Sequence, residues 1–277
     1  MRITSVIFFA SVILWLCGCS CGRKADFARI STESGEWELV WNDEFDSDSL
    51  DRAKWSFDTS GNSIRWGNNE LQRYVEGEGP EAFIQDGILT IRLTPSADSL
   101  YPFTSARINT KGKASWRYGR FEARLRLPAG KGTWPAFWLM PEASSYGVWP
   151  RSGEIDIMEN VGYARDSIVG TVHTYMYNHH RHTQKGASIM LPRSVEEFHI
   201  YAVEWDEEQI RFYADGQKYF TFENNGRGEA YWPFDREFYI ILNFAAGGDW
   251  GGKKGVDFSA FPQDYQADYV RVYKKIS

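Results

Sequence analysis

Apolar and polar residues alternate with a period of two along much of this chain, and this alternation constrains the fold more than any other feature. From Arg120 to Leu127 apolar side chains at every second position oppose charged ones, as expected of a half-buried strand. The pair Asp215-Gly216 forms the turn of a predicted hairpin. No helical period of any length occurs. Further strands are predicted over 87–93, 199–205, 209–213, 218–222, 238–244 and 269–273.

These strands predict an all-β protein. No linker interrupts residues 37–277, so we expect this segment to form one domain, an antiparallel β-sandwich. The three cysteines, Cys17, Cys19 and Cys21, all precede it. The folded domain therefore has no disulfide, and its stability must come from its core.

The N-terminus has the pattern of an export signal. Arg2 is followed by an apolar run from Ile3 to Leu16, which fits a signal peptide better than a membrane span. The following Cys17-Gly18-Cys19 completes a sequence that resembles the cleavage box of bacterial lipoproteins. We therefore predict a signal peptide over 1–18, a lipid anchor on Cys19 in the bacterial outer membrane, and a polar tether over 19–36. A plain secretory signal with later cleavage is the alternative.

Charge and composition limit the partners of the chain. The net charge is −6, the pI is near 5.5, and Lys and Arg are scattered rather than gathered in a basic stripe. Nucleic acid is therefore not an expected partner. Aromatic residues make up 16% of the chain, which suits a cleft whose rings stack on sugars, although any single ring more often packs in the core. We expect a monomer.

Three acids, Glu154, Asp156 and Glu159, stand in the segment Ser152-Gly-Glu-Ile-Asp-Ile-Met-Glu-Asn160. In a regular strand Glu159 would point away from the other two. A β-bulge near Ile157-Met158 would return it to their face. Such a cluster suits glycoside hydrolysis with retention, in which one carboxylate attacks the anomeric carbon and another, roughly 5–5.5 Å away, protonates the leaving oxygen. A solvated acidic edge strand and a cation site are the alternatives.

The acidic segment and its surroundings resemble glycoside hydrolase family 16, the laminarinase-like clan. The resemblance covers nearly the whole chain after the tether. It is carried, besides 153–162, by Trp41-Asn-Asp-Glu-Phe45, Trp66-Gly-Asn-Asn-Glu-Leu-Gln-Arg-Tyr74, Tyr118-Gly-Arg-Phe-Glu-Ala-Arg124, Thr133-Trp-Pro-Ala-Phe-Trp138, Trp149-Pro150, Val172-His173, Ile241-Leu-Asn-Phe-Ala-Ala-Gly-Gly248 and Asp268-Tyr-Val-Arg-Val-Tyr273. The resemblance implies a concave β-jelly-roll with an open cleft, cleavage inside the polysaccharide, and retention of anomeric configuration.

The resemblance also implies a role for each acid. Glu154 would be the nucleophile, Asp156 its assistant and Glu159 the general acid/base. The residues that match sugar-binding positions are Asn68, Arg107, Trp134, Trp138, Trp149 and His173. Indoles offer flat apolar platforms, while amide, guanidinium and imidazole groups offer directional hydrogen bonds. Trp138 as core packing and Arg107 as a structural ion-pair partner are the alternatives.

Two groups of residues invite a metal-site interpretation. Catalysis is expected to need no cofactor, but relatives hold a structural Ca²⁺, which the resemblance places at Glu44, Gly87 and Asp268; carboxylate and carbonyl oxygens suit such an ion. The histidines at 179, 180 and 182 invite a transition-metal interpretation. Adjacent residues rarely converge on one ion, so a solvated loop at the rim of the cleft is the preferred interpretation.

The substrate is the least determined part of the prediction. The form Glu-Ile-Asp-Ile-Met-Glu with Trp-Pro before it favours the laminarinase-like branch, and hence β-1,3-glucan or mixed-linkage β-1,3/1,4-glucan. The segment 175–185 lacks the glycine-rich composition expected after the histidine of a typical laminarinase. This leaves endo-β-galactosidase activity on mucin-type O-glycans or galactans as an alternative. A non-catalytic glycan-binding lipoprotein is disfavoured because both Glu154 and Glu159 are present.

Overall fold

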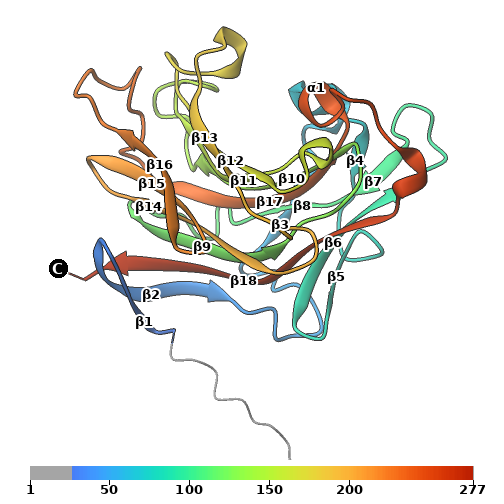
Figure 1. Cartoon of the computed structure of the whole chain (residues 1–277), viewed down its shortest axis with the longest axis horizontal. Coiled ribbons are helices and arrows are strands. Elements are labelled where there is room, and N and C mark those ends of the chain that lie inside the picture. Colours follow the sequence, from blue (N-terminus) through green and yellow to red (C-terminus); the bar gives the residue numbers. More distant parts are fainter. Residues whose placement is uncertain (1–26, 277) are drawn as a thin grey trace, which may run out of the picture.

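The computed structural model describes residues 27–276, and two stacked β-sheets make up most of this part of the chain (Figure 1). The inner sheet has seven strands in the order β13-β12-β11-β10-β17-β8-β3. Their bounds are β3 (Ser56–Phe57), β8 (Arg107–Asn109), β10 (Thr133–Pro141), β11 (Glu154–Glu159), β12 (Ser167–His173), β13 (Lys185–Met190) and β17 (Phe238–Ala246). The acidic segment is thus a strand near the middle of the inner sheet.

The outer sheet has eleven strands, eight of them in the order β16-β15-β14-β9-β18-β6-β7-β4. Strands β1 and β2 join it beside β18, and β5 joins beside β6. The bounds are β1 (Arg29–Thr32), β2 (Gly35–Asp43), β4 (Gln72–Tyr74), β5 (Ala82–Gln85), β6 (Ile88–Pro95), β7 (Phe103–Ser105), β9 (Gly119–Arg126), β14 (His199–Trp205), β15 (Gln209–Ala214), β16 (Gln217–Glu223) and β18 (Gln263–Lys275). Strands β4 and β7 pair in parallel, and the other pairings are antiparallel.

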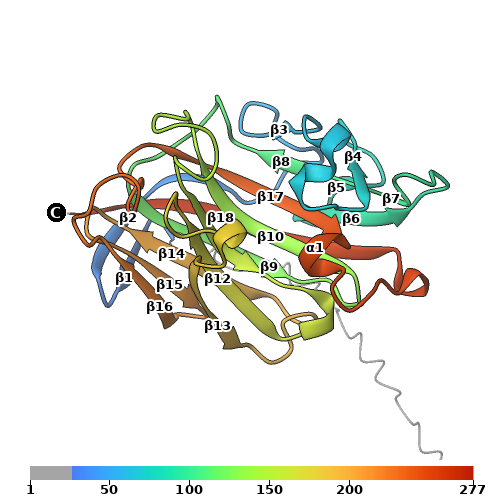
Figure 2. The same cartoon turned by 90° about the horizontal axis from the view of Figure 1, so that it is seen from above.

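Helical segments between residues 27 and 276 are short. They are η1 (Asn62–Gly67), η2 (Gly162–Ala164), η3 (His179–Arg181), α1 (Gly248–Gly251) and η4 (Phe258–Ala260). No helix in this range is long and apolar enough to cross a membrane. Helix α1 stands on the side of the inner sheet that faces away from the outer sheet (Figure 1, Figure 2).

The predicted β-sandwich is confirmed, and the alternation explains its core. In β9 the side chains of Phe121, Ala123 and Leu125 are fully buried between the sheets. Arg120 and Glu122 on the other face are also buried, because Arg120 forms ion pairs of 2.7 Å with Glu122 and 3.0 Å with Glu204. The charged residues in the alternation of β9 therefore lie on the outer face of the sheet, but they are not all exposed to solvent.

The folded body begins earlier than the sequence predicts, because β1 and β2 form a hairpin in which Ile30 lies opposite Trp37. The Trp37 indole is buried and donates to Thr32 Oγ1 at 3.0 Å, and Thr32 Oγ1 donates to Glu204 Oε1 at 2.9 Å. The sequence predicts residues 29–36 as part of the tether because this stretch is polar and lacks a clear period. In the structure no side chain of β1 is fully buried, so the strand has no apolar pattern to mark it. The predicted signal peptide and Cys19 lie outside the described residues.

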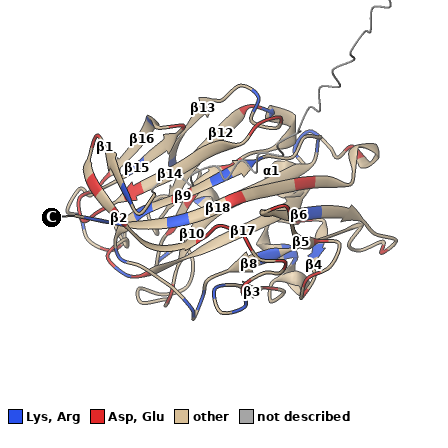
Figure 3. Ribbon diagram, turned by 90° about the horizontal axis from the view of Figure 1, so that it is seen from below, with Lys and Arg blue, Asp and Glu red and all other residues tan. Residues whose placement is uncertain are grey.

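Charges of both signs are interspersed on the outer sheet (Figure 3). Pairs such as Arg92 with Asp264, at 2.7 Å, connect neighbouring strands. Each exposed pair of this kind contributes little to stability. The outer sheet is therefore a mixed-charge surface, and the aromatic and acidic side chains of the site lie on the inner sheet.

Candidate active site

A break in the regular pairing of β11 brings the three acids to one face. Against β12, Asp156 lies opposite Thr171 and Glu159 lies opposite Val169, so the register shifts between the two acids. Ile157 and Met158 occupy the irregular stretch and are buried in the core. This is the bulge that the odd spacing required, because without it Glu159 would face the core.

Each outer acid accepts a hydrogen bond from an indole. Trp149 Nε1 donates to Glu154 Oε2 at 2.6 Å, and Trp134 Nε1 donates to Glu159 Oε1 at 2.9 Å. His173 lies opposite Glu154 on the neighbouring strand β12, with Nε2 at 3.3 Å from Asp156 Oδ2 and 3.8 Å from Glu154 Oε1. Neutral indole donors therefore hold the acids at both ends of β11, and one imidazole contacts Glu154 and Asp156.

Burial raises the pKa values of all three acids. The pKa of Glu154 rises to about 8 through burial and then the charge of Asp156, and that of Glu159 rises to about 7 mainly through burial. Burial and the charge of Glu159 raise the pKa of Asp156 well above its usual range. The His173 charge and the indole hydrogen bonds oppose these shifts. The cluster therefore retains protons near neutral pH, as a site with an acid catalyst requires.

The acids open into a cleft of two connected hollows of about 280 and 580 Å³, which share Asn68, Trp134 and the three acids. The first hollow also contains Arg107, Trp138 and Trp149, and the second contains His173. All six predicted sugar-binding residues thus lie in the cleft. His179 and His180, predicted only as part of a loop at the rim, also line the cleft. Other lining residues were not predicted as site residues: Trp66, Glu70, Met140, Asn243 and Trp250.

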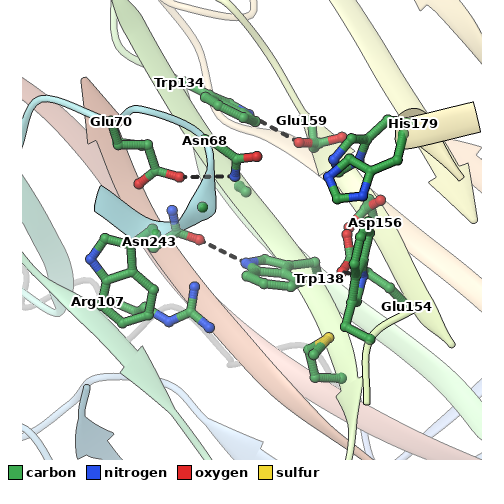
Figure 4. Close-up of a pocket in the computed structure, with 17 residues that line it drawn as sticks. Asn68, Glu70, Arg107, Trp134, Trp138, Glu154, Asp156, Glu159, His179 and Asn243 are labelled. Atoms are coloured by element: carbon green, nitrogen blue, oxygen red, sulfur yellow. Dashed lines mark hydrogen bonds between the residues drawn. The ribbon is translucent and has the colours of Figure 1, made fainter. Parts of the chain in front are cut away.

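Arg107 lies between two indole rings, with its guanidinium carbon 4.4 Å from the Trp66 ring centre and 4.8 Å from that of Trp138. It also pairs with Asp58 at 3.2 Å. Trp138 is not core packing, because it is partly exposed in the cleft and its Nε1 donates to Asn243 Oδ1 at 2.7 Å (Figure 4). Arg107 therefore forms the ion pair named as the alternative and also lines the cleft through a cation–π stack, and its contact with sugar stays a prediction.

Asn68 is held by a buried acid that the sequence analysis did not single out. Its Nδ2 donates to Glu70 Oε1 at 3.2 Å (Figure 4), while Gln72 Nε2 donates to Glu70 Oε2 at 2.5 Å. Burial raises the pKa of Glu70. Nearby, Arg65 and Trp66 adopt left-handed backbone conformations at φ 49° and 54°, which cost free energy in non-glycine residues and occur often at functional sites. Both Trp66 and Glu70 lie in the segment 66–74, which resembles the family. That resemblance is the signal in the sequence that could have identified them as site residues.

The predicted calcium ligands meet in space but do not fit the ion as side-chain ligands. Pairing of β18 with β2 and with β6 brings the three positions near one another. However, the Glu44 carboxylate accepts two hydrogen bonds from Arg271, at 2.9 and 2.8 Å, and Asp268 accepts one from Arg124 at 2.5 Å. A cation bound through these carboxylates would have to displace two guanidinium groups. Calcium at Glu44, Gly87 and Asp268 stays a prediction.

A group within the described residues that could hold an ion is the cluster of Glu154, Asp156 and His173, whose ligand atoms lie within 4.8 Å of one another. These atoms belong to the proposed catalytic centre, so an ion there would compete with substrate. His180 and His182 are exposed, as expected of a rim loop, whereas His179 is half-buried against Trp149. The other histidines of the loop do not join the cluster.

A curved sandwich with buried acids at the centre of an indole-lined cleft is the architecture of an enzyme that cleaves glycosidic bonds. The chain belongs to glycosyl hydrolases family 16, whose model matches residues 69–271. It is 48% identical to the beta-glucanase of Rhodothermus marinus over 252 residues, which cover 88% of this chain and 87% of that protein.

Solved structures agree with this assignment. The laminarinase from Rhodothermus marinus matches with a TM-score of 0.84 and 48% identity, covering 87% of this chain and 98% of that one. SCLam, a non-specific endo-beta-1,3(4)-glucanase, matches with a TM-score of 0.83 and 41% identity, covering 86% of this chain and 95% of that one. The matched form of SCLam was crystallised with 1,3-beta-D-cellotriosyl-glucose. The chain is therefore a glycoside hydrolase of the laminarinase-like type.

Proposed function

We propose that this enzyme hydrolyses internal bonds of β-1,3-glucan or mixed-linkage β-1,3/1,4-glucan with retention of anomeric configuration. The observation that carries the proposal is the bulge in β11, which places Glu154, Asp156 and Glu159 in one open cleft. The similarity to a beta-glucanase and to a laminarinase supports glucan as the substrate. Because hollows extend to both sides of the acids, the cleft can accommodate chain on both sides of the cleaved bond.

The two reaction steps assign one role to each outer acid. In the first step Glu154 attacks the anomeric carbon while Glu159 protonates the departing glycosidic oxygen, which leaves a covalent glycosyl-enzyme. In the second step Glu159 takes a proton from water, whose oxygen attacks the same carbon and releases Glu154. Two inversions give net retention. The proton on Glu159 is restored at the end of the cycle.

A nucleophile must be ionised, but burial raises the pKa of Glu154 and so favours its protonated form. Asp156 can offset this effect. Asp156 has a pKa raised well above its usual range and lies beside Glu154. With the proton on Asp156, a hydrogen bond to Glu154 leaves that carboxylate negative and oriented. The His173 imidazole faces both groups and favours their charged forms when protonated.

The cleft walls would bind sugar rings by stacking and hydrogen bonding. Trp138 and Trp149 present rings in the first hollow and Trp134 borders both hollows. The amide of Asn68 is oriented by Glu70. Such platforms with fixed polar groups are suited to pyranose faces and hydroxyls.

A panel digestion tests substrate and mechanism together. The purified enzyme is incubated with laminarin, mixed-linkage β-glucan, agar-type galactan and mucin-type O-glycans, and products are followed by mass spectrometry and early-time proton NMR. We expect oligosaccharides of several lengths from the two glucans, with the β-anomer formed first. Initial α-anomer would refute retention, release of monosaccharide alone would refute internal cleavage, and digestion of galactan or O-glycans without glucan would establish the endo-β-galactosidase alternative.

We also propose that the enzyme is exported and anchored through Cys19. The support is the apolar run before Cys17-Gly18-Cys19 and the polar residues after it. Fractionation of cells expressing the wild type and Cys19→Ala tests this. The wild type should carry a lipid-modified N-terminus and sediment with outer membrane, whereas the variant should be released or accumulate unprocessed. Equal processed mass and equal membrane association of both proteins would contradict the anchor.

A further inference from the structure

The rim loop, residues 178–183, packs against the Trp149 indole. The His179 ring centre lies 4.9 Å from the Trp149 centre with the planes inclined by 33°, and His180 approaches at 5.0 Å and 78°. In the same cluster His179 lies 5.3 Å from His173. The Trp149 indole therefore contacts the His179 imidazole in a tilted arrangement and the His180 imidazole edge-on.

Trp149 depends on such support more than Trp134 does. Trp134 lies on β10, where pairing with β17 fixes its backbone. Trp149 lies in the loop that connects β10 and β11, and its neighbour Val148 is 77% exposed. The 2.6 Å hydrogen bond from Trp149 to Glu154 therefore ends on a carboxylate fixed in a strand but begins on an indole in a loop.

The rim loop is itself well fixed. Asn178 is buried, and its Nδ2 donates to the carbonyl oxygens of Thr174 at 3.1 Å and Tyr175 at 3.0 Å. Thr183 Oγ1 donates to the Met176 carbonyl at 2.9 Å and accepts from the Asn178 N–H at 3.2 Å. These bonds connect the loop to the end of β12. They give His179 a fixed position from which it can hold another side chain.

We infer that His179 is a positioning residue, whose ring contact holds the Trp149 indole on Glu154 and so orients the proposed nucleophile. The inference rests on the proposed role of Glu154. The contact needs a flat ring at position 179 and no proton from it. Phenylalanine at this position should therefore preserve the function, and alanine should not.

The test compares His179→Ala and His179→Phe, which both remove the titratable group, so a difference between them isolates the ring contact. Other titratable or charged groups near Glu154 stay unchanged. They are Asp156 and Glu159 on β11, His173 on β12, Tyr239 on β17, His180 of the rim loop and Arg107 on β8. Arg181→Ala is the matched control, because Arg181 belongs to the same loop but stacks on Tyr175. Kinetics on soluble β-glucan are measured across pH for each protein.

We expect His179→Ala to lower kcat/KM about tenfold, mainly through kcat, as for loss of an interaction that orients the reacting group. The acidic limb of its pH–rate profile should shift to higher pH by about 0.5 unit, because loss of the indole hydrogen bond disfavours the ionised form of Glu154. His179→Phe should restore both values to near wild type, and Arg181→Ala should keep the wild-type limb.

A second measurement makes the test independent of activity. NMR titration with ¹³C-labelled glutamate, assigned through Glu154→Gln, should show a higher Glu154 pKa in His179→Ala than in His179→Phe. An unchanged Glu154 pKa and acidic limb in His179→Ala would overturn the inference, as would equal impairment of both variants. A wild type inactive on every glycan would refute the proposed function, while the NMR comparison would still decide the role of His179. If His179→Ala fails to fold, the comparison of His179→Phe with the wild type remains. Kinetics of His179→Phe that differ from those of the wild type would then overturn the inference.

Discussion

The two ends of β11 carry the same pair, a glutamate and an indole, in different surroundings. At Glu154 the indole comes from a loop, is braced by the rim loop, and shares the carboxylate with His173. At Glu159 the indole comes from strand β10 and packs edge-on against Trp250 of α1, at 5.5 Å and 83°. The difference teaches that residue type alone does not assign the roles of nucleophile and acid. The roles rest on the resemblance to the family and stay predictions, and the different contacts of the two pairs allow each role to be tested separately.

The largest effect is expected when either of the two glutamates, Glu154 or Glu159, is removed. Glu154→Ala should lose activity on every substrate by more than about 10⁴-fold, because no leaving group replaces a nucleophile. Glu159→Ala should lose roughly 10²- to 10⁴-fold on polysaccharide, but should still be glycosylated by an aryl glycoside whose phenolate needs little protonation. Steady-state and burst kinetics on both substrate types measure the contrast.

Azide provides the matching control for these two variants. Added to Glu159→Ala, it should accelerate turnover and give the β-glycosyl azide through two inversions. Added to Glu154→Ala, it should give the α-azide through one inversion. The opposite pairing of anomer and variant would exchange the two roles.

Removal of each indole N–H while keeping a ring gives the next largest effect. Trp149→Phe should lower kcat/KM about tenfold, because a hydrogen bond to a charged group is worth about 1.5–3 kcal/mol. It should also shift the acidic limb of the pH–rate profile to higher pH. Trp134→Phe should act on the basic limb instead, since Glu159 works as the acid. If both variants move the same limb, the two ends are not chemically distinct.

Trp250→Ala tests the brace at the Glu159 end. Loss of its edge-on contact with Trp134 should lower kcat/KM about threefold, in line with the roughly 0.5–1.5 kcal/mol of an aromatic pair. The acidic limb should stay in place, in contrast to His179→Ala. An acidic limb that moves in Trp250→Ala would show that the two braces are coupled through the cluster.

The smallest effect concerns stability. Glu154 and Asp156 hold protons more tightly in the folded chain than in the unfolded one, because the pKa of Glu154 rises from 4.5 to about 8 and that of Asp156 rises well above its usual range. The stabilising contribution of these protons is therefore complete below pH 4.5 and is lost as pH rises through 8. Glu154→Gln cannot ionise and should exceed the wild type in Tm by at least a few degrees at pH 8. Glu159→Gln should gain less, because its carboxyl rises only to about 7. Calorimetry at pH 4.5, 6 and 8 decides whether the gain grows with pH.

Sequence reasoning identified the features that depend on local pattern. Alternation gave the strands, and the odd spacing of Glu154, Asp156 and Glu159 required the bulge that β11 contains. It missed features that depend on distant contacts. Asn243 belongs to an apolar strand whose sequence is typical of a core, and its polar role is shown by its hydrogen bonds with the distant residues Trp138 and Tyr74. His179 contacts an indole thirty positions away in sequence, which no local pattern could indicate.

The bulge in β11 also has a genetic consequence. Ile157 and Met158 stand between Asp156 and Glu159 where β12 has a single residue, and both side chains are buried in the core. Deletion of the Met158 codon would leave Glu-Ile-Asp-Ile-Glu, a strictly alternating strand whose three acids share one face without any irregularity. The same three acids can therefore be encoded by genes whose coding sequences differ in length by three nucleotides. An alignment that forces these acids into fixed columns would misplace one of them.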